Sequence, residues 1–219
     1  MGTFHAICGR ILRREANFLP VNQNYVIFDA DDQLTLVKRV IKEKGINDKD
    51  YRPDVVLNKI SKAKNDLLGP DDYPILSFRD EVIKEIYHGY QKYLVGSNAM
   101  DFDDMLLYTA KLLENHPDLR EKYAHRFRHI LVDEFQDTNL AQYYLLQNLA
   151  SVHQNIFVVG DEDQSIYRWR GADYHNVERF IHKYPHAKKI LLEQNYRSTQ
   201  TILNVAMAVI DENPNRTEK

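Results

Sequence analysis

The chain has 219 residues, of which 43% are hydrophobic and 28% charged, and its formal net charge is -3. Such a chain can bury a core in one large or two modest domains, and its charge excludes a polycation that binds nucleic acid by bulk charge. The single cysteine, Cys8, excludes an internal disulfide framework; we expect a packing residue in a reducing compartment. No apolar run approaches the roughly 18 residues of a membrane span, and no signal peptide is visible, so the sequence predicts a cytoplasmic protein without a membrane partner.

The first part of the chain has the periodicity of helices. A helical pattern starts at Thr3, and residues 17–97 continue with helical stripes that local signals delimit. Gly45 follows one stripe as a C-cap residue, Pro53 occupies the first turn of the next helix, and Ser77 caps a long third one. This stretch is predicted to be a small all-helical unit.

After Gly96 the pattern changes to short apolar runs that alternate with helices. The predicted helices are residues 102–115, a segment opened by Pro117, and residues 139–150, 177–182 and 201–212. The predicted strands are residues 129–133, 156–161 and 190–193. Strands joined by helices through short connections imply right-handed crossovers and a parallel sheet.

Each predicted strand ends in polar residues. They are Asp133 and Glu134, then residues 160–164, then residues 193–197 with Arg197. An acidic pair after one strand is more often a solvated turn than a site. Ligands of open parallel sheets bind beyond the carboxyl ends of the strands, so three polar ends at one edge favour a binding site there.

Five segments of the chain carry recognisable motifs. They are TFH at 3–5, FDD at 102–104, VDEFQDTN at 132–139, VGDEDQSIYRWRGA at 159–172 and LEQNYRS at 192–198. In this order they resemble the DNA-contacting motif, the motif before the Walker-B strand, the Walker-B motif, and the third and fourth motifs of UvrD/Rep/PcrA-type superfamily 1 DNA helicases. The resemblance covers essentially the whole chain, and two of the motifs are long and nearly unbroken.

The resemblance implies an α/β fold: the parallel sheet of a P-loop NTPase (RecA-like) core, incomplete, with an all-helical inserted subdomain. It also implies a domain division. Residues 1–16 form a DNA-contacting helix of the first motor domain, 17–97 a 1B-like helical insert, 98–197 the remainder of the 1A-like motor domain, and 198–219 the start of a 2A-like second motor domain.

The same resemblance implies ATP and Mg²⁺ as cofactors and assigns catalytic roles. Asp133 resembles the residue that coordinates magnesium through water, and Glu134 the base that aligns the attacking water. Gln164 resembles the sensor of the γ-phosphate, Tyr196 the aromatic residue that stacks on adenine, and Arg197 the finger that stabilises charge on the γ-phosphate. From the residues alone, Gln164 also fits a strand-capping turn and Tyr196 a core aromatic.

Single-stranded DNA is the implied partner, in a 3′ to 5′ translocase that acts in repair or replication. The residues expected to contact it are Thr3, Phe4, His5, Tyr167, Trp169 and Arg170. A sole tryptophan is more often a core residue, but its flanking arginines favour base stacking, which contributes about 1–3 kcal/mol per base. The chain departs from the family pattern at Ala6, where a serine is usual.

A phosphate-binding loop needs glycines followed by lysine and serine or threonine, and none of the eight glycines here precedes a lysine. In the family that loop lies before Thr3. We therefore expect a truncated motor that is inactive by itself, with an open sheet edge prone to dimerisation or strand exchange. Two alternatives stay open: a non-catalytic single-stranded DNA-binding module and the helicase half of a helicase–nuclease.

Two further groups of residues receive no site. Lys59, Lys62 and Lys64 fit a phosphate-contacting face and a solvated helix face equally well. The nine histidines show no zinc-type spacing with cysteine, so no metal other than magnesium is expected.

Overall fold

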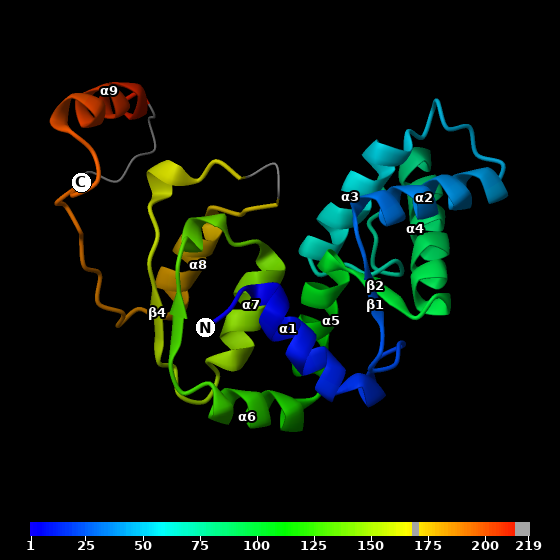
Figure 1. The fold of residues 1–219 in the computed structure, drawn as a ribbon, viewed down its shortest axis with the longest axis horizontal. Coiled ribbons are helices and arrows are strands. Elements are labelled where there is room, and N and C mark those ends of the chain that lie inside the picture. Colours follow the sequence, from blue (N-terminus) through cyan, green and yellow to red (C-terminus); the bar gives the residue numbers. More distant parts are fainter. Residues whose placement is uncertain (168–170, 213–219) are drawn as a thin grey trace. The chain divides into compact units, whose positions relative to one another are not determined.

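The computed structural model describes residues 1–167 and 171–212. Over these residues the chain is mixed α/β and mostly helical, with two small two-stranded sheets (Figure 1). The helices are α1 (Phe4–Arg14), α2 (Ala30–Glu43), α3 (Pro53–Asn65), α4 (Phe78–Gly96), α5 (Phe102–Asn115), α6 (Pro117–Arg126), α7 (Leu140–Leu149), α8 (His175–Lys183) and α9 (Gln200–Ile210). The strands are β1 (Val26–Phe28), β2 (Ala99–Asp101), β3 (Ile130–Val132) and β4 (Ile156–Val158); the 3₁₀ turns are η1 (Ala16–Phe18), η2 (Phe135–Asp137) and η3 (Glu162–Gln164).

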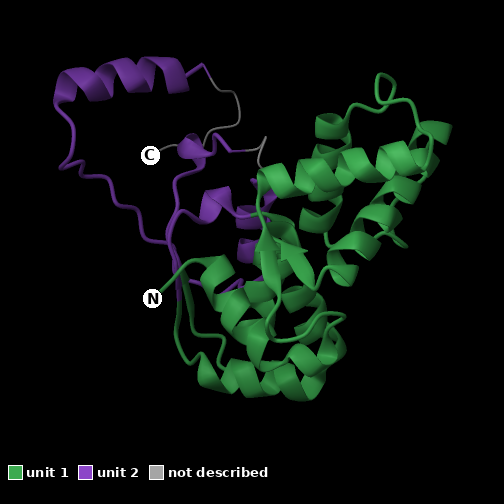
Figure 2. Ribbon diagram, turned by 45° about the vertical axis from the view of Figure 1, so that its right-hand side comes forward, with its two compact units in different colours: residues 1–130, 139–157 green, residues 131–138, 158–219 purple. Residues whose placement is uncertain are grey.

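The chain divides into two compact units (Figure 2). The first contains residues 1–130 and 139–157, and the second contains residues 131–138 and 158–219. The division passes through β3 and β4. The predicted division into motor domains and an inserted subdomain rests on the family resemblance and stays a prediction.

Three helices of the first unit, α2, α3 and α4, enclose an apolar core. Its buried side chains are Leu36, Val37, Val40, Ile41, Val56, Ile60, Ala63, Tyr73, Ile83, Ile86, Tyr87, Tyr90, Leu94 and Ala99. Gly89 lies where α4 crosses α2, because a Cβ at this position would stand 2.6 Å from Cγ1 of Val40. A larger residue at Gly89 therefore requires the two helices to separate.

The predicted boundaries of these helices are confirmed, because each depends on a local signal. Gly45 follows α2 with a φ of +65°, a conformation that costs little only without a Cβ. Pro53 is the first residue of α3, where no backbone N–H is needed. The hydroxyl of Ser77 accepts a hydrogen bond from the N–H of Asp80 and so caps α4.

The expectation that residues 17–97 are all helical was wrong at β1. Val26 pairs with Ala99 and Phe28 with Asp101, so that β1 and β2 run parallel. Three residues are too few to show the alternation that marks a strand, and the partner strand is distant in the sequence. Asp101 ends β2 and also caps α5, since its carboxylate accepts a hydrogen bond from the N–H of Asp104 at 2.7 Å.

Helix α5 packs against α1, α6 and α7 in the remainder of the first unit. Cys8, Ile11 and Leu12 are the side chains that α1 buries in this layer, together with Gly9. Burial raises the pKa of the Cys8 thiol to about 11, so the thiol is protonated at neutral pH. This confirms that Cys8 is a packing residue. No helix among the described residues is long and apolar enough to cross a membrane.

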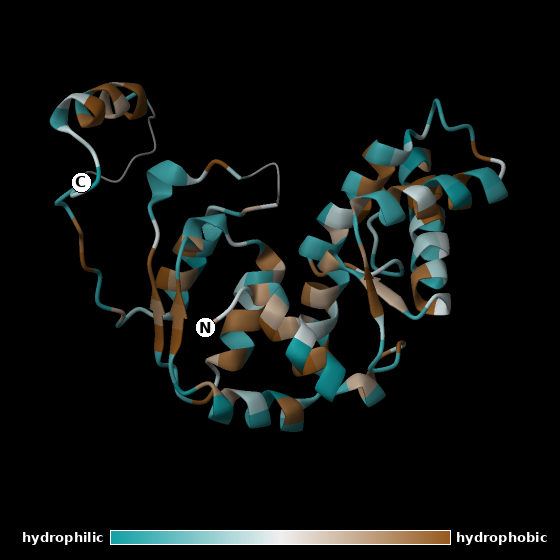
Figure 3. Cartoon of the chain, viewed as in Figure 1, coloured by the Kyte–Doolittle hydropathy of each residue, from teal (hydrophilic) through white to brown (hydrophobic). Residues whose placement is uncertain are grey.

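The second unit contains the ends of β3 and β4. Figure 3 shows both strands as apolar. The prediction of a third strand at residues 190–193 was wrong: no strand forms there, and Leu192 is 85% exposed. A strand forms only where a neighbour completes its backbone hydrogen bonds, and among the described residues β3 and β4 pair only with each other. Helix α9 also leaves apolar side chains exposed, among them Ile202, Val205 and Val209.

Candidate functional site

The site begins where β3 and β4 end. In the second unit the N–H of Val159 donates to the carbonyl of Val132 at 2.8 Å, and the N–H of Phe135 donates to the carbonyl of Val159 at 2.9 Å. These bonds bring the residues after both strands to one place, as the sequence predicted for the first two of its three strand ends. The N–H of Ile130 donates to the carbonyl of Asn155 at 3.0 Å. Residue numbers therefore rise together along both strands, from this pair to Val132 and Val159, so the strands are parallel.

Asp133 and Glu134 follow β3 and are both exposed. Glu134 has a φ of +50° and a ψ of 45°, a left-handed conformation that turns the chain from the strand into η2. Its N–H donates to Oδ1 of Asp133 at 3.0 Å. The turn thus presents two consecutive acidic residues to solvent.

Two amide side chains link Glu134 to the turn after β4. Nε2 of Gln136 donates to Oε2 of Glu134 at 2.8 Å, and Oε1 of Gln136 accepts from the N–H of Asp161 at 3.0 Å. The carboxylate of Asp161 then accepts from Nε2 of Gln164 at 2.8 Å and from the N–H of Asp163 at 3.1 Å. We call Glu134, Gln136, Asp161 and Gln164 the carboxylate–amide chain.

Gly160 permits this chain of contacts. A Cβ at residue 160 would stand 2.6 Å from Oε1 of Gln136 and 3.3 Å from its backbone nitrogen. No side chain fits there without displacing Gln136. The glycine of the third motif is therefore required by close packing between two turns rather than by its own backbone angles.

In the part of the chain that the structure describes, Tyr196 and Arg197 have only local contacts. Tyr196 is 93% exposed, and Oδ1 of Asn195 accepts from the N–H groups of Arg197 and Ser198, each at 2.9 Å. Among the described residues, no hydrogen bond or ion pair joins Tyr196 or Arg197 to the carboxylate–amide chain. We predicted that three strand ends meet at one edge of the sheet. Only the ends of β3 and β4 meet among the described residues, because residues 190–193 do not form a strand.

A second polar cluster supports the turn after β3 from α8. Nδ2 of Asn176 donates to the carbonyl of Thr138 at 2.9 Å, and the N–H of Asp173 donates to the same carbonyl at 3.0 Å. Arg179 donates to both Asp173 and Asn176. Burial acts to raise the pKa of Asp173, but hydrogen bonds from Arg179 and His175 outweigh it and lower the pKa. Sequence reasoning missed Asn176, which is fully buried, because nothing in its local pattern marks a distant carbonyl.

The expected DNA contacts fall in both units. In the first unit, Thr3 caps α1 by accepting from the N–H of Ala6 at 3.2 Å. Phe4 is half-buried, and the ring of His5 packs edge-on against Phe102, with ring centroids 5.5 Å apart. Burial lowers the pKa of His5, more than the nearby charge of Asp103 raises it, so the imidazole is neutral at neutral pH.

In the second unit, Tyr167 is 36% exposed. Trp169 and Arg170 lie outside the described residues. The aromatic and basic part of the third motif therefore begins at an accessible tyrosine, and the other two DNA contacts predicted there stay predictions.

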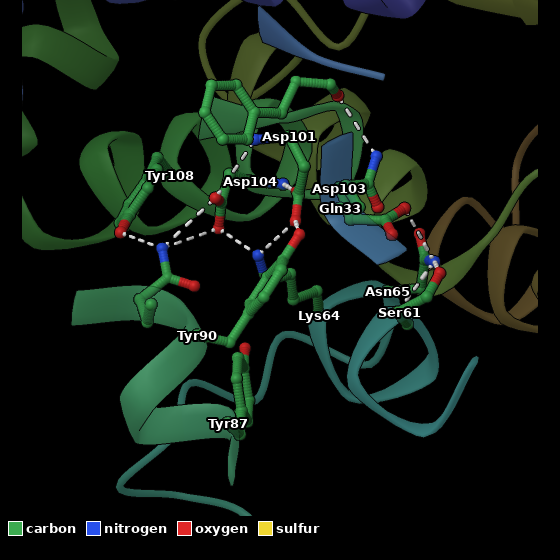
Figure 4. A network of polar contacts seen from close by, with 12 residues as sticks. Gln33, Ser61, Lys64, Asn65, Tyr87, Tyr90, Asp101, Asp103, Asp104 and Tyr108 are labelled. Carbon is green, nitrogen blue, oxygen red and sulfur yellow. Dashed lines mark hydrogen bonds and ion pairs between the residues drawn. The ribbon is translucent and has the colours of Figure 1, made fainter. Parts of the chain in front are cut away.

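The structure excludes Lys64 from any phosphate-contacting face (Figure 4). Its side chain is 0% exposed, and Nζ lies 2.6 Å from Oδ2 of Asp101 and 2.8 Å from Oδ1 of Asp104. The hydroxyl of Tyr90 also donates to Oδ2 of Asp101, at 2.7 Å. Desolvation acts to lower the pKa of Lys64, but attraction by the two aspartates outweighs it and raises the pKa, so the ammonium stays charged.

A sequence signal for this burial existed. Lys64 continues the spacing of Val56 and Ile60, the apolar face of α3, whereas Lys62 is exposed. Lys59 is partly exposed and pairs with Asp80 at 3.4 Å. A lysine in register with an apolar stripe predicts a buried partner of opposite charge.

The described residues contain no group of three or more His, Cys, Asp or Glu side chains placed to hold a metal. Asp133 nevertheless has the chemistry that magnesium selects. It is an exposed carboxylate, and no hydrogen bond among the described residues uses its second oxygen, Oδ2. Magnesium keeps several waters and is commonly held by one or two carboxylates together with substrate phosphates.

Comparison with known proteins agrees with the motifs. The model of the UvrD/REP helicase N-terminal domain matches residues 1–185. A protein of Bacillus subtilis (strain 168) named ATP-dependent DNA helicase PcrA is 46% identical over 221 aligned residues, covering 100% of this chain and 30% of the relative. Proteins of the same name from Staphylococcus epidermidis and Staphylococcus aureus are 45% identical with the same coverage. The chain therefore spans 30% of the length of these curated relatives. Because the family model matches most of its length, the chain belongs to the UvrD/REP helicase family.

Proposed function

We propose that this chain supplies the magnesium-binding, water-activating and strand-contacting residues of an ATP-dependent DNA helicase that moves 3′ to 5′ along single strands. The observation that carries the proposal is the carboxylate–amide chain, which joins Glu134 after β3 to Gln164 after β4. A protein that only binds DNA needs neither carboxylates nor a γ-phosphate sensor at this edge. The relatives' name, ATP-dependent DNA helicase, supports the same function.

The proposed reaction is transfer of the γ-phosphoryl group of ATP to water. The water oxygen bonds to the γ-phosphorus, the bond from that phosphorus to the β–γ bridging oxygen breaks, and ADP leaves. Glu134 accepts the proton that the water loses, since its carboxylate is exposed and anchored at one oxygen. Gln164 contacts the γ-phosphate, and Arg197 stabilises its charge, a contribution of roughly 10³–10⁵ in rate for arginine fingers.

Asp133 is the residue proposed to hold magnesium, through a water. When bound, magnesium neutralises charge on the phosphates. Asp133 fits because it is exposed, and its Oδ1 accepts a hydrogen bond from the Glu134 N–H, which restrains the carboxylate. Tyr196, proposed to stack on adenine, has the exposed ring that such stacking needs.

The proposed fold is the parallel sheet of a RecA-like P-loop core. Two observations support it: β3 and β4 are parallel and joined through α7, and functional residues follow both strands. The division into motor domain and inserted subdomain is proposed on the family pattern. The solvent-exposed apolar residues of the 190–193 segment and α9 are surfaces that such a larger sheet and second motor domain would cover.

The activity is tested by grafting. Residues 1–219 of this chain replace the matching residues of the Bacillus subtilis relative, and single-stranded-DNA-stimulated ATP hydrolysis and strand unwinding are measured with and without magnesium. We expect both activities in the graft and a loss of about 10²–10⁴-fold in kcat for Glu134→Gln. A graft that folds and binds DNA but hydrolyses no ATP contradicts the proposal.

DNA contact by the third motif is tested separately. Trp169→Ala should weaken binding of a labelled single-stranded oligonucleotide by about 1–3 kcal/mol, the contribution of one stacked base. Phe78→Ala is the matched control, because Phe78 is an exposed aromatic residue of α4 outside every motif. Equal affinities for the wild type and Trp169→Ala, with the fold intact by circular dichroism, would make Trp169 a packing residue.

A second candidate, a non-catalytic single-stranded DNA-binding module, is favoured by one observation: no glycine of this chain precedes a lysine. For the 219-residue chain itself we expect DNA binding without ATP hydrolysis. Robust magnesium-dependent hydrolysis by this chain alone would rule that out. Light scattering on the same sample tests the expected dimerisation or strand exchange through an open sheet edge, which a monodisperse monomer would contradict.

A further inference from the structure

Gln136 is the middle residue of the carboxylate–amide chain, and no role was expected for it from the sequence. We propose that Gln136 is a positioning residue: it holds the Glu134 carboxylate for water activation and ties that orientation to the turn that carries Gln164. This inference rests on the proposed function, since it assigns a partner to the proposed base.

The orientation of the Gln136 amide is determined by its surroundings. The side chain is 2% exposed, and one of its two partners is the backbone N–H of Asp161, a group that can only donate. The atom that faces Asp161 must therefore be the oxygen, Oε1. Nε2 is left to face Oε2 of Glu134, at 2.8 Å, and can only donate to it.

Acidic groups surround Glu134. Its N–H binds the Asp133 carboxylate, and Asp161 lies at the other end of Gln136. The pKa of Asp137 is raised, first by burial and then by the charge of Glu134. Among the described residues no cation contacts Glu134, and the Gln136 amide is the side-chain donor to its carboxylate. A fixed carboxylate orientation is what a base that aligns a water requires.

The same amide is sensitive to the turn after β4. Asp161 donates its N–H to Gln136 while its carboxylate holds Gln164 at 2.8 Å, and Gly160 leaves no free space beside Oε1. A movement of Gln164 that displaces Asp161 therefore disturbs the hydrogen bond from the Asp161 N–H to Oε1 of Gln136. The Gln136 amide then shifts, and so does the hydrogen bond that it donates to Glu134. One buried amide links the phosphate-sensing side chain to the proposed base.

Two substitutions separate positioning from simple packing. Gln136→Met keeps the volume and removes both hydrogen bonds. Gln136→Glu keeps an acceptor for the Asp161 N–H but replaces the donor to Glu134 with a second carboxylate. Two facing carboxylates repel each other, so the substituted side chain no longer holds the Glu134 carboxylate in place.

The matched control is Gln91→Glu in the first unit. Nε2 of Gln91 donates to both carboxylate oxygens of Asp104, at 3.1 and 3.2 Å, so this variant also sets two carboxylates face to face. Gln91 is partly buried in a different polar network, with Asp104 and Tyr108, and among the described residues it has no hydrogen bond to the carboxylate–amide chain. Any effect that Gln136→Glu shares with Gln91→Glu is a consequence of lost stability.

The first measurement uses the 219-residue chain and needs no activity. Hydrogen exchange, followed by NMR, reports on the Asp161 amide. We expect this amide to exchange at least tenfold faster in Gln136→Met than in the wild type, and at the wild-type rate in Gln136→Glu, which keeps the acceptor. Equal exchange in Gln136→Met and the wild type overturns the positioning role.

The second measurement uses the grafted helicase. Gln136→Glu should lower kcat for ATP hydrolysis at least tenfold with KM changed less than threefold. Gln91→Glu should leave kcat within threefold of the wild type. A wild-type kcat for Gln136→Glu overturns the inference, whereas a folded wild-type graft without hydrolysis overturns the proposed function and leaves the hydrogen-exchange result to decide the positioning.

Discussion

The molecule contains two acidic clusters that are held in opposite ways. Asp101 and Asp104, in the first unit, are buried and surround the ammonium of Lys64. Asp133 and Glu134, in the second unit, are exposed and receive hydrogen bonds from a backbone N–H and a neutral amide. Buried carboxylates need a compensating cation, because removing charge from water is costly; exposed carboxylates can be oriented by neutral donors alone.

The difference in burial separates carboxylates that stabilise the fold from carboxylates that are available for chemistry. Burial, followed by the charge of Asp101, raises the pKa of Asp104 to about 6, despite the opposing effect of Lys64. Such a group has no access to substrate and serves to join α3, α4 and α5. Glu134 has solvent access and a left-handed backbone, which has an energetic cost that the fold tolerates at a site.

The comparison predicts its largest effect at Lys64. Lys64→Met should lower the free energy of unfolding by about 3–5 kcal/mol, because it leaves two buried aspartates without their cation. Urea denaturation of the 219-residue chain at pH 8, followed by circular dichroism, measures it. Lys62→Met is the control: Lys62 is exposed on the same helix, and its loss should change stability by less than about 0.5 kcal/mol.

The Lys64→Met penalty should depend on pH. Without Lys64 the pKa of Asp104 rises above its present value of about 6, while in the unfolded chain it is about 3.9. The folded variant then binds more protons than the unfolded chain between these values, so its stability falls as pH rises through this window and recovers as pH is lowered. Denaturation at pH 8 and pH 5 should show a smaller difference from the wild type at pH 5; an equal difference would place Asp104 outside the interaction.

Substitutions at two closely packed glycines, Gly89 and Gly160, test how each unit responds to an added methyl group. Gly89→Ala should lower the free energy of unfolding by about 1–3 kcal/mol, because the added Cβ meets Val40 across two helices. Gly160→Ala places its Cβ against Oε1 of Gln136, so its distinctive effect should be a loss of kcat in the grafted helicase. Equal hydrolysis by the two variants at a temperature where both are folded would remove Gly160 from the site.

The smallest expected effect is an increase in stability. Glu134→Asn should raise the free energy of unfolding by up to about 1 kcal/mol, because asparagine adopts a positive φ at lower cost than glutamate, while ATP hydrolysis by the graft is lost. Gln154→Asn is the matched variant, since Gln154 has a φ of +49° outside the site; it should gain stability and retain activity. Thermal unfolding and hydrolysis measured on both variants check this. A stability loss at Glu134 alone would show that its side chain contributes more to the fold than the strain costs.

Much of this fold was readable from local signals. Pro53 and Pro117 begin α3 and α6, the residues of α5 match the predicted 102–115, and two apolar runs ending in acid became β3 and β4. The positions of Asp133, Glu134 and Gln164 after strands follow from the same runs. Signals of this kind are encoded within a few neighbouring residues, so no tertiary contact is needed to read them.

Other features depended on partners far away in the sequence. β1 exists because it pairs with β2, and Lys64 is buried because Asp101 and Asp104 compensate its charge. Residues 190–193 form no strand because none of the described residues pairs with them. The direction in which the Gln136 amide points was likewise decided by the N–H of Asp161 across two turns. Composition and periodicity thus determined which segments are helices and which chemistry follows the strands, whereas pairing, charge burial and amide orientation are properties of distant groups in contact, which only the tertiary structure decides.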